Sequence, residues 1–262
     1  MKCTFYKYQG TGNDFIIIDN RQQLISKNDT KNVARLCDRK FGIGADGLML
    51  LENPEDVEDD FKMVYYNADG NKSSMCGNGG RCLVAFAQKL GLIDDKATFT
   101  AIDGKHYATV KNEIVTLQMQ DVNNIEVYAS HLFLNTGSPH HISMVSDVAS
   151  VDVFKEGRAI RRGAPYFEEG TNVNFVQQLA PDFFKVRTYE RGVEDETLSC
   201  GTGVTAVALA MHAIKKTALN TINVNTPGGD LSVSFAKDTD GTYKDVILSG
   251  PATFVFKGEI VW

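Results

Sequence analysis

Two of the five cysteines in this chain stand in nearly the same small, glycine-rich setting, far apart in the sequence. Cys76 lies in SMCGNG and Cys200 lies in SCGTG, and a segment of helical periodicity follows each. A cysteine directly before a helix sits at the positive end of the helix dipole, which stabilises thiolate over thiol. The pair is therefore a candidate for proton transfer.

The glycines that follow each cysteine suggest what the helix starts could bind. Glycine lets a bound anion approach the backbone closely, and the first amides of a helix have no intrahelical partner. Two such helix starts facing one another would bracket one small ligand, with a sulfur on each side and N–H donors for its carboxylate. That arrangement suits the inversion of a carbon, because one proton leaves one face and another arrives at the opposite face.

Other interpretations of the cysteines stay open at this point. A disulfide between Cys76 and Cys200 is at odds with a reducing cytosol. A zinc site needs about four ligands, but the sequence has no CxxC pair, and His140 and His141 point to opposite sides if extended. A coincidence of turn chemistry would also give two similar motifs. The remaining cysteines are interpreted as small buried apolar residues: Cys3, Cys37 and Cys82.

The surroundings of the two cysteines form an internal repeat. A shift of 124 positions places Cys76 on Cys200, and a strand, a loop, Cys-Gly-x-Gly and a helix follow the same order in both halves. The shift also aligns Asn67 with Arg191. We therefore expect two similar α/β domains, with a boundary near residues 121–128.

Strand-type and helix-type segments alternate with turns along both halves. Helices are expected over residues 30–40, 76–91, 151–162 and 200–216. Strands are expected over residues 3–8, 14–19, 47–52, 61–67, 97–102, 106–110, 114–119, 131–137, 172–179, 183–190, 221–226, 231–235, 245–250 and 252–262.

The composition is that of a globular chain. Its 262 residues suffice for one large or two moderate domains, and 43% hydrophobic with 23% charged residues indicate a real core. The net charge of -6 argues against bulk electrostatic binding to nucleic acid or to an anionic membrane. No apolar run approaches the roughly 20 residues of a membrane span. The N-terminal sequence lacks a signal-peptide pattern. Five cysteines are an odd number in a chain too long to be a disulfide scaffold, so we expect a cytoplasmic protein with reduced thiols.

Seven blocks, in order, resemble the diaminopimelate epimerases, a family of cofactor-independent amino-acid epimerases. They are YQGTGNDFIIID, DRKFGIGADGL, YNADGNKSSMCGNGGRC, NTGSPH, TNVNF, YERGVEDETLSCGTG and the terminal strands, which together cover nearly the whole chain. The resemblance implies an α/β (α+β) fold of two pseudo-symmetric domains, each a curved antiparallel β-barrel-like sheet around a central helix. Because the last strand of the family returns to the first domain, residues 1–122 and 251–262 would form one domain and residues 123–250 the other.

The resemblance also implies a role for each site residue. Cys76 and Cys200 would be the acid–base thiols. Residues around the reacting carbon of the amino-acid substrate would be Asn13, Gly77, Asn78, Gly201 and Thr202, and residues around its distal end would be Asn67, Asn172, Glu190 and Arg191. The distal assignment makes chemical sense, because arginine can grip a carboxylate bidentately and glutamate can pair with an ammonium. Without the resemblance, the asparagines would be turn residues and Glu190–Arg191 a solvated charge pair.

Two positions depart from the pattern of many family members. Some members carry Gln where this chain has Gly47, and many read GNPH where it has Gly-Ser-Pro-His. Ser138 is shorter than Asn, so we expect an adjusted or water-mediated grip on the distal end. His140, two residues on, could tune or contact the site, or serve the turn structurally.

The resemblance thus predicts an isomerase that converts LL-2,6-diaminopimelate to the meso form for lysine and peptidoglycan precursor biosynthesis. Neither PLP nor a metal is expected, nor a nucleic-acid or membrane partner. The family also suggests a homodimer, although no feature of the sequence supports one.

Two alternatives remain. A proline- or hydroxyproline-type racemase on the same fold would not need the distal pair Glu190 and Arg191, and the proline racemase pattern carries His at the position of Asn78. A non-catalytic amino-acid-binding protein would need no second matching cysteine, and a thiol-redox protein would show CxxC.

Overall fold

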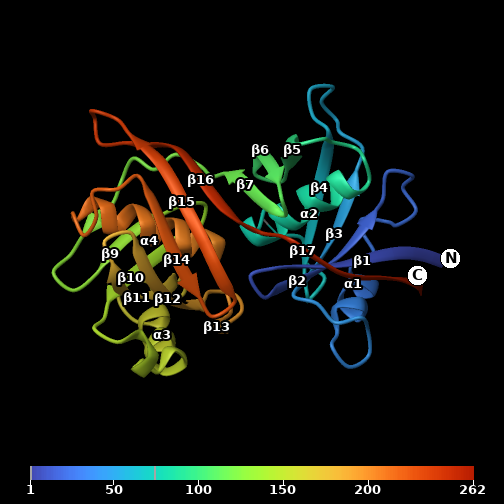
Figure 1. The fold of residues 1–262 in the computed structure, drawn as a ribbon. Coiled ribbons are helices and arrows are strands. Elements are labelled where there is room, and N and C mark those ends of the chain that lie inside the picture. The colour runs from blue at the N-terminus through green and yellow to red at the C-terminus, as the bar shows by residue number, and fades with distance from the viewer. Residues whose placement is uncertain (1, 74) are drawn as a thin grey trace. The chain divides into compact units, whose positions relative to one another are not determined.

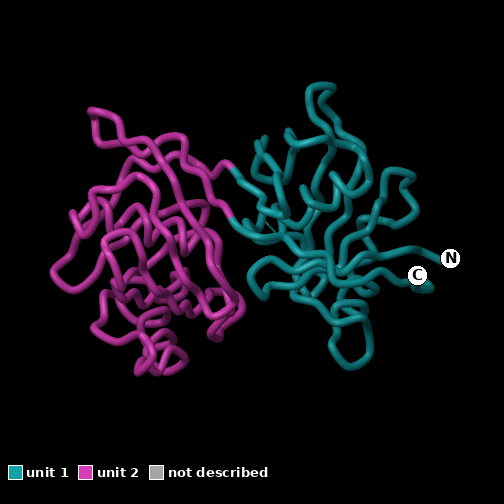
Figure 2. The backbone as a smooth tube through the Cα atoms, viewed as in Figure 1, with its two compact units in different colours: residues 1–117, 250–262 teal, residues 118–249 magenta. Residues whose placement is uncertain are grey.

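The computed structural model describes residues 2–73 and 75–262, and the chain divides into two compact units (Figures 1 and 2). Unit 1 comprises residues 1–117 and 250–262, and unit 2 comprises residues 118–249. The boundaries expected from the sequence lie five residues later at the first place and one residue later at the second.

Unit 1 is a mixed sheet that follows chain order, with the last strand added beside the first. Its strands are β1 (Lys2–Gly10), β2 (Asn13–Asp19), β3 (Gly47–Glu52), β4 (Phe61–Asn67), β5 (Lys96–Ala101), β6 (Gly104–Lys111), β7 (Ile114–Gln118) and β17 (Thr253–Val261). β17 pairs antiparallel with β1, and β1 with β2. β2 and β3 are parallel, β3 and β4 antiparallel, β4 and β5 parallel, and β5–β6–β7 antiparallel.

Unit 2 repeats this scheme of strand pairings. Its strands are β8 (Glu126–Val127), β9 (Leu132–Asn135), β10 (Pro139–Met144), β11 (Asn172–Ala180), β12 (Phe183–Glu190), β13 (Asp195–Thr197), β14 (Thr221–Thr226), β15 (Gly229–Lys237) and β16 (Tyr243–Pro251). The pairs β10/β11 and β12/β14 are parallel, and β8/β9, β9/β10, β11/β12, β14/β15 and β15/β16 are antiparallel. β8 therefore takes the place beside β9 that β17 takes beside β1.

A helix fills each parallel crossover, as this connection requires. α1 (Thr30–Cys37) joins β2 to β3, and α2 (Gly77–Lys89) joins β4 to β5. In unit 2, the 3₁₀ turn η1 (Val148–Ser150) and α3 (Val153–Arg162) join β10 to β11, and α4 (Gly201–Ala213) lies between β12 and β14. α2 and α4 are both 13 residues long and stand 124 positions apart, so the repeat seen in the sequence is a structural repeat.

The central position of α2 and α4 explains their composition. α4 packs against β9, β10, β11, β14 and β15, and it carries alanines and valines on almost every side because almost every side is buried. α2 likewise packs against β1, β2, β3, β6 and β17. β3 is buried at every position because α2 and α1 both pack on it.

Several details differ from the sequence-based expectations, which also missed the short strands β8 and β13. α1 ends at Cys37 rather than Lys40, because Asp38 is extended and its carboxylate accepts from the amides of Lys40 and Phe41. β10 was not predicted, because its histidines are both buried and hide the usual alternation of apolar and polar residues. The sheet of each unit also includes two parallel strand pairs, where only antiparallel pairs were expected.

None of the helices in the described ranges is long and apolar enough to cross a membrane.

Candidate active site

Cys76 and Cys200 occupy the same structural position in their units. Each is the N-cap of its central helix, with extended backbone angles of φ -99°, ψ 125° and φ -126°, ψ 109° respectively. Neither side chain caps its helix, unlike the Ser, Thr or Asp usual at this position, so both sulfurs are left for other partners. Cys200 is buried, and Cys76 is partly buried. The geometry is that of two thiols at the positive ends of two helix dipoles.

The other three cysteines, Cys3, Cys37 and Cys82, are buried, as expected. Burial raises the pKa of the Cys3 thiol, and it raises the pKa of Cys37 and of Cys82 to about 12. These thiols hold their protons at neutral pH and offer no acid–base chemistry there.

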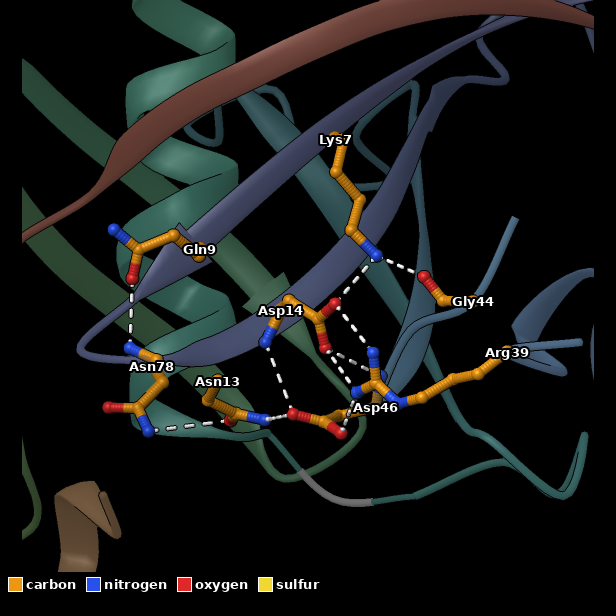
Figure 3. Close-up of polar contacts among 9 residues, drawn as sticks. Lys7, Gln9, Asn13, Asp14, Arg39, Gly44, Asp46 and Asn78 are labelled. Atoms are coloured by element: carbon orange, nitrogen blue, oxygen red, sulfur yellow. Dashed lines mark hydrogen bonds and ion pairs between the residues drawn. The ribbon is translucent and has the colours of Figure 1, made fainter. Parts of the chain in front are cut away.

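Asn13 connects the start of β2 to the start of α2 in unit 1 (Figure 3). Its Oδ1 accepts from the Cys76 thiol at 3.6 Å and from Asn78 Nδ2 at 3.4 Å. The structure therefore brings together three of the residues expected at the reacting end. Asn67 lies apart from these contacts, exposed at the end of β4.

Arg81, in the second turn of α2, is a buried cation that the sequence analysis did not assign. It donates to Asn78 Oδ1 at 3.0 Å, to the carbonyl of Gly77 at 3.3 Å and to Thr11 Oγ1 at 3.4 Å. Burial lowers the pKa of Arg81, while neighbouring thiolates, among them that of Cys76, would raise it. Arg81 is visible in the motif CGNGGRC, but nothing in the sequence predicted that its guanidinium would point into the unit.

A chain of hydrogen bonds leads to Cys200 in unit 2. Asn174 Nδ2 lies 3.2 Å from His140 Nδ1, His140 Nε2 lies 3.0 Å from Thr202 Oγ1, and Thr202 Oγ1 lies 3.5 Å from the Cys200 sulfur. An amide nitrogen can only donate, so Nδ1 accepts and Nε2 carries the proton that Thr202 accepts. The Thr202 hydroxyl proton is then available to the sulfur.

His140 is neutral in this environment. Burial, with a smaller contribution from the charge of Arg191, lowers the pKa of His140 to about 3. Its ring is fully buried in β10, so its place is inside the unit rather than in a turn. Asn174, also fully buried, fixes the tautomer of His140. The sequence did not single it out, because only Asn172 of the TNVNF block was assigned a role.

Three of the four residues expected at the distal end of the substrate, Asn172, Glu190 and Arg191, lie in unit 2. Asn172 Nδ2 donates to Ser138 Oγ at 2.8 Å, and its Oδ1 accepts from the backbone amide of Arg191 at 2.9 Å. The Arg191 guanidinium donates to the carbonyl of Glu169 at 3.0 Å. Glu190 Oε2 accepts from Thr197 Oγ1 at 3.0 Å. Ser138 thus serves to orient Asn172.

Gly47, where some family members carry Gln, has no room for a side chain because Tyr65 and Tyr66 pack directly against it. A Cβ at this position would lie 2.5 Å from Tyr65 Cε2 and 2.6 Å from the carbonyl oxygen of Tyr66. A Gln side chain would therefore displace the Tyr65 ring or the backbone of β4. Tyr65 takes up the space that the missing side chain leaves.

Comparison with known proteins identifies the family. The family model for diaminopimelate epimerase matches residues 5–125 and 132–255. The diaminopimelate epimerase of Flavobacterium psychrophilum is 57% identical over 97% of this chain and 99% of its own length. That of Aquifex aeolicus is 40% identical over 98% of this chain and 97% of its own length.

Solved structures confirm the predicted fold class of two pseudo-symmetric α+β domains. A PhzF-family phenazine biosynthesis protein from Bacillus anthracis matches with a TM-score of 0.79 and 13% identity, covering 100% of each chain. A hydroxyproline epimerase from Agrobacterium vitis matches with a TM-score of 0.71 and 13% identity, over 99% of this chain and 92% of that one. The family model and the full-length relatives are more specific than this shared fold: the chain belongs to the diaminopimelate epimerase family and is an enzyme of the isomerase class.

Proposed function

We propose that this enzyme converts LL-2,6-diaminopimelate to meso-diaminopimelate by proton transfer through Cys76 and Cys200, without PLP or a metal. One observation carries the proposal: two units of the same topology each place one thiol at the N-cap of an equivalent 13-residue helix. The names of the full-length relatives support the substrate. The product would supply lysine and peptidoglycan precursor synthesis in the cytoplasm.

The chemistry requires the two thiols to reach opposite faces of one α-carbon. A thiolate takes the α-proton, so that the C–H bond breaks and its electron pair spreads into the substrate carboxylate. The other thiol gives its proton to the opposite face, and a new C–H bond forms with inverted configuration. The enzyme ends with the proton on the first sulfur, ready for the reverse reaction.

The starts of α2 and α4 would stabilise the charge that develops on the carboxylate. Gly77 and Asn78 in unit 1, and Gly201 and Thr202 in unit 2, occupy the first two positions of these helices. The dipole at a helix N-terminus is worth about 0.3–1 kcal/mol to an exposed anion and up to about 2 kcal/mol to a partly buried one. Aimed amides contribute more in the transition state where water is excluded.

Specificity would come from the distal end of the substrate. Asn67, Asn172, Glu190 and Arg191 are proposed to bind the second ammonium and carboxylate, which proline and hydroxyproline lack. In unit 2, the contact of Asn172 with the Arg191 backbone holds two of these residues together before substrate arrives.

A turnover panel tests the proposal. Reduced enzyme, dialysed against EDTA and treated with a carbonyl reagent that captures PLP, should epimerise LL-diaminopimelate and leave L-proline and trans-4-hydroxy-L-proline unchanged. Cys76→Ser and Cys200→Ser should each lower kcat at least about a thousandfold, because serine is far less acidic than cysteine. Turnover of proline instead of diaminopimelate would favour the racemase alternative, and full activity of either Ser variant would contradict the two-thiol mechanism.

A further inference from the structure

Asp46 lies one contact behind Asn13, in the loop that leads into β3. Asn13 Nδ2 donates to Asp46 Oδ2 at 2.6 Å, and Arg39 Nη2 donates to Asp46 Oδ1 at 2.7 Å (Figure 3). Asp46 also accepts from the backbone amide of Asp14 at 3.2 Å. The carboxylate is therefore held from three sides.

These contacts fix which way the amide of Asn13 points. A carboxylate cannot donate, so the atom of Asn13 that faces Asp46 has to be the nitrogen, and the oxygen has to face Cys76. The other end is fixed in the same way, because Arg81 can only donate to Asn78 Oδ1, which turns Asn78 Nδ2 toward Asn13 Oδ1. The carboxylate of Asp46 at one end of this row and the guanidinium of Arg81 at the other thus set the direction of each hydrogen bond between them.

A fixed carbonyl oxygen beside Cys76 favours the thiol over the thiolate. The thiol can donate to Asn13 Oδ1, as it does at 3.6 Å, whereas a thiolate would place a second electron-rich atom against that oxygen. An amide turned the other way would present N–H groups and favour the thiolate. The orientation of one side-chain amide therefore decides the sign of its effect on Cys76.

Other ionisable groups also act on Cys76. The buried cation Arg81, on the same helix, favours its thiolate. Cys82, which keeps its proton, lies on the following turn, and Asp103 accepts from the backbone amide that precedes Cys76. In the proposed reaction, Cys76 acts as a base in one direction and as an acid in the other, so both its thiolate and its thiol must form readily. A contact that stabilises the thiol would balance the stabilisation of the thiolate by Arg81.

We propose that Asp46 is a positioning residue that holds the Asn13 carbonyl against Cys76 and so keeps the thiol form of Cys76 available. The importance of the Cys76 thiol rests on the proposed function. The effect of Asp46 on that thiol depends only on contacts within unit 1 and does not require substrate.

Alkylation of Cys76 measures the effect without turnover. Trypsin cleaves after Lys72 and Arg81, so the peptide between them contains Cys76 and no other cysteine. Reduced, intact protein is treated with iodoacetamide over a range of pH, and modification of this peptide is followed by mass spectrometry. Asp46→Asn should move the midpoint of Cys76 alkylation down by about half to one pH unit, because the amide of Asn13 can then turn.

Asp14→Asn is the matched control. Asp14 lies in the same cluster and pairs with Arg39 and Lys7, both at 2.7 Å, but its carboxylate makes none of the contacts that orient the Asn13 side chain. It is also the less exposed of the two carboxylates, at 19% against 42% for Asp46. The control should therefore lose at least as much stability as Asp46→Asn. Its Cys76 midpoint should stay within about 0.2 pH units of wild type, because the Asp14 carboxylate does not orient the Asn13 side chain.

A double-mutant cycle tests whether Asp46 acts through Asn13. Asn13→Leu should shift the midpoint in the same direction, and adding Asp46→Asn to it should produce no further shift. The proposal is overturned if Asp46→Asn leaves the midpoint at its wild-type value, if Asp14→Asn shifts it equally, or if the two changes add. A roughly tenfold fall in kcat/KM in Asp46→Asn, with a normal fold, is the accompanying expectation. A shifted midpoint in a protein that turns over no diaminopimelate would separate the two proposals.

Discussion

The two units build the same helix start and support it with different chemistry. In unit 1, Cys76 meets an amide whose direction is set by an aspartate and a buried arginine. In unit 2, Cys200 meets a hydroxyl whose direction is set by a neutral histidine. A carbonyl oxygen faces one sulfur, and a hydroxyl proton is available to the other.

This difference shows that the two units share the backbone arrangement around the cysteine but not the polar side chains that contact its sulfur. A reaction that swaps the roles of two thiols still needs a starting state with one thiol and one thiolate. The carbonyl beside Cys76 favours the thiol there, and the hydroxyl beside Cys200 favours the thiolate there. In the proposed reaction, the symmetric scaffold would therefore carry an asymmetric proton distribution.

The largest expected difference between the units is the stability that each loses at acidic pH. Burial lowers the pKa of His140 to about 3 and, together with the charge of His131, that of His141 to about 4. The unfolded state takes up protons near pH 6.5 that the folded state refuses, so unit 2 should lose stability, on the order of a few kcal/mol, as pH falls below 6.5.

Unit 1 should respond at lower pH. Burial would raise the pKa of Asp14, but hydrogen bonds from Arg39 and Lys7 and their charges outweigh it and lower the pKa to about 2. The stabilisation is present above pH 4 and is lost between about pH 4 and 2, on the order of 2 kcal/mol. Urea unfolding at pH 7, pH 5 and pH 3 checks both statements, with fluorescence of the single tryptophan, Trp262, reporting unit 1 and circular dichroism reporting both units. An unchanged dichroism midpoint at pH 5 would contradict the statement about unit 2, and an unchanged tryptophan midpoint at pH 3 would contradict the statement about unit 1.

The next largest difference concerns the third residue of each central helix. A Cβ at Gly203 would lie 2.5 Å from Asn174 Oδ1 and 3.4 Å from the Cys200 sulfur, whereas a Cβ at Gly79 would lie 3.2 Å from the flexible end of Met49. Gly203→Ala should destabilise the protein by about 3 kcal/mol and Gly79→Ala by less than about 1 kcal/mol. Chemical denaturation measures both, and equal losses would show that the two helix starts are packed alike.

A smaller effect is expected from the hydroxyl beside Cys200. Thr202→Val leaves the buried Nε2–H of His140 without its acceptor and should cost about 1–2 kcal/mol of stability. The same change removes a donor to the sulfur, so alkylation of Cys200 should move to higher pH. Thr202→Ser keeps the hydroxyl and serves as the control, and a Cys200 profile that moves equally in both variants would break the assignment.

The smallest expected effect lies at the edge of unit 1. Lys2 and Glu259 form an ion pair at 3.5 Å with both side chains mostly exposed. Lys2→Ala should change the free energy of unfolding by no more than about 0.5 kcal/mol. A larger loss, measured by urea denaturation, would show that β17 depends on this pair rather than on its long antiparallel register with β1.

The sequence could predict what depends on local patterns. Glycines and a cysteine before an apolar periodic segment predicted both helix starts, and alternation predicted most strands. β10 was not predicted because Pro139, His140 and His141 give no strand pattern, although the burial of the two histidines shapes the site. Asp46, Arg81 and Asn174 escaped because their roles depend on partners brought close only by folding and, for Arg81, on a side chain pointing inward.

Gly47 shows a further limit. Its lack of a side chain could be read from the sequence, but that Tyr65 covers the place could not. The pairing of Gly47 with Asn67 across β3 and β4 also became visible only in the register. Comparison by position alone therefore locates a departure from the family without saying what compensates for it.

Solvent isotope tracing tests the two-thiol reaction most directly. Wild-type enzyme is mixed with LL-diaminopimelate in heavy water, and the reaction is stopped at low conversion. Product and remaining substrate are then separated, and the deuterium content of each is measured by mass spectrometry. If one thiol removes the proton and a different thiol delivers another, nearly every product molecule carries one deuterium at the inverted carbon while the remaining LL substrate carries almost none. Product that keeps the original proton, or substrate that gains deuterium as fast as product forms, would contradict proton transfer by two separate thiols.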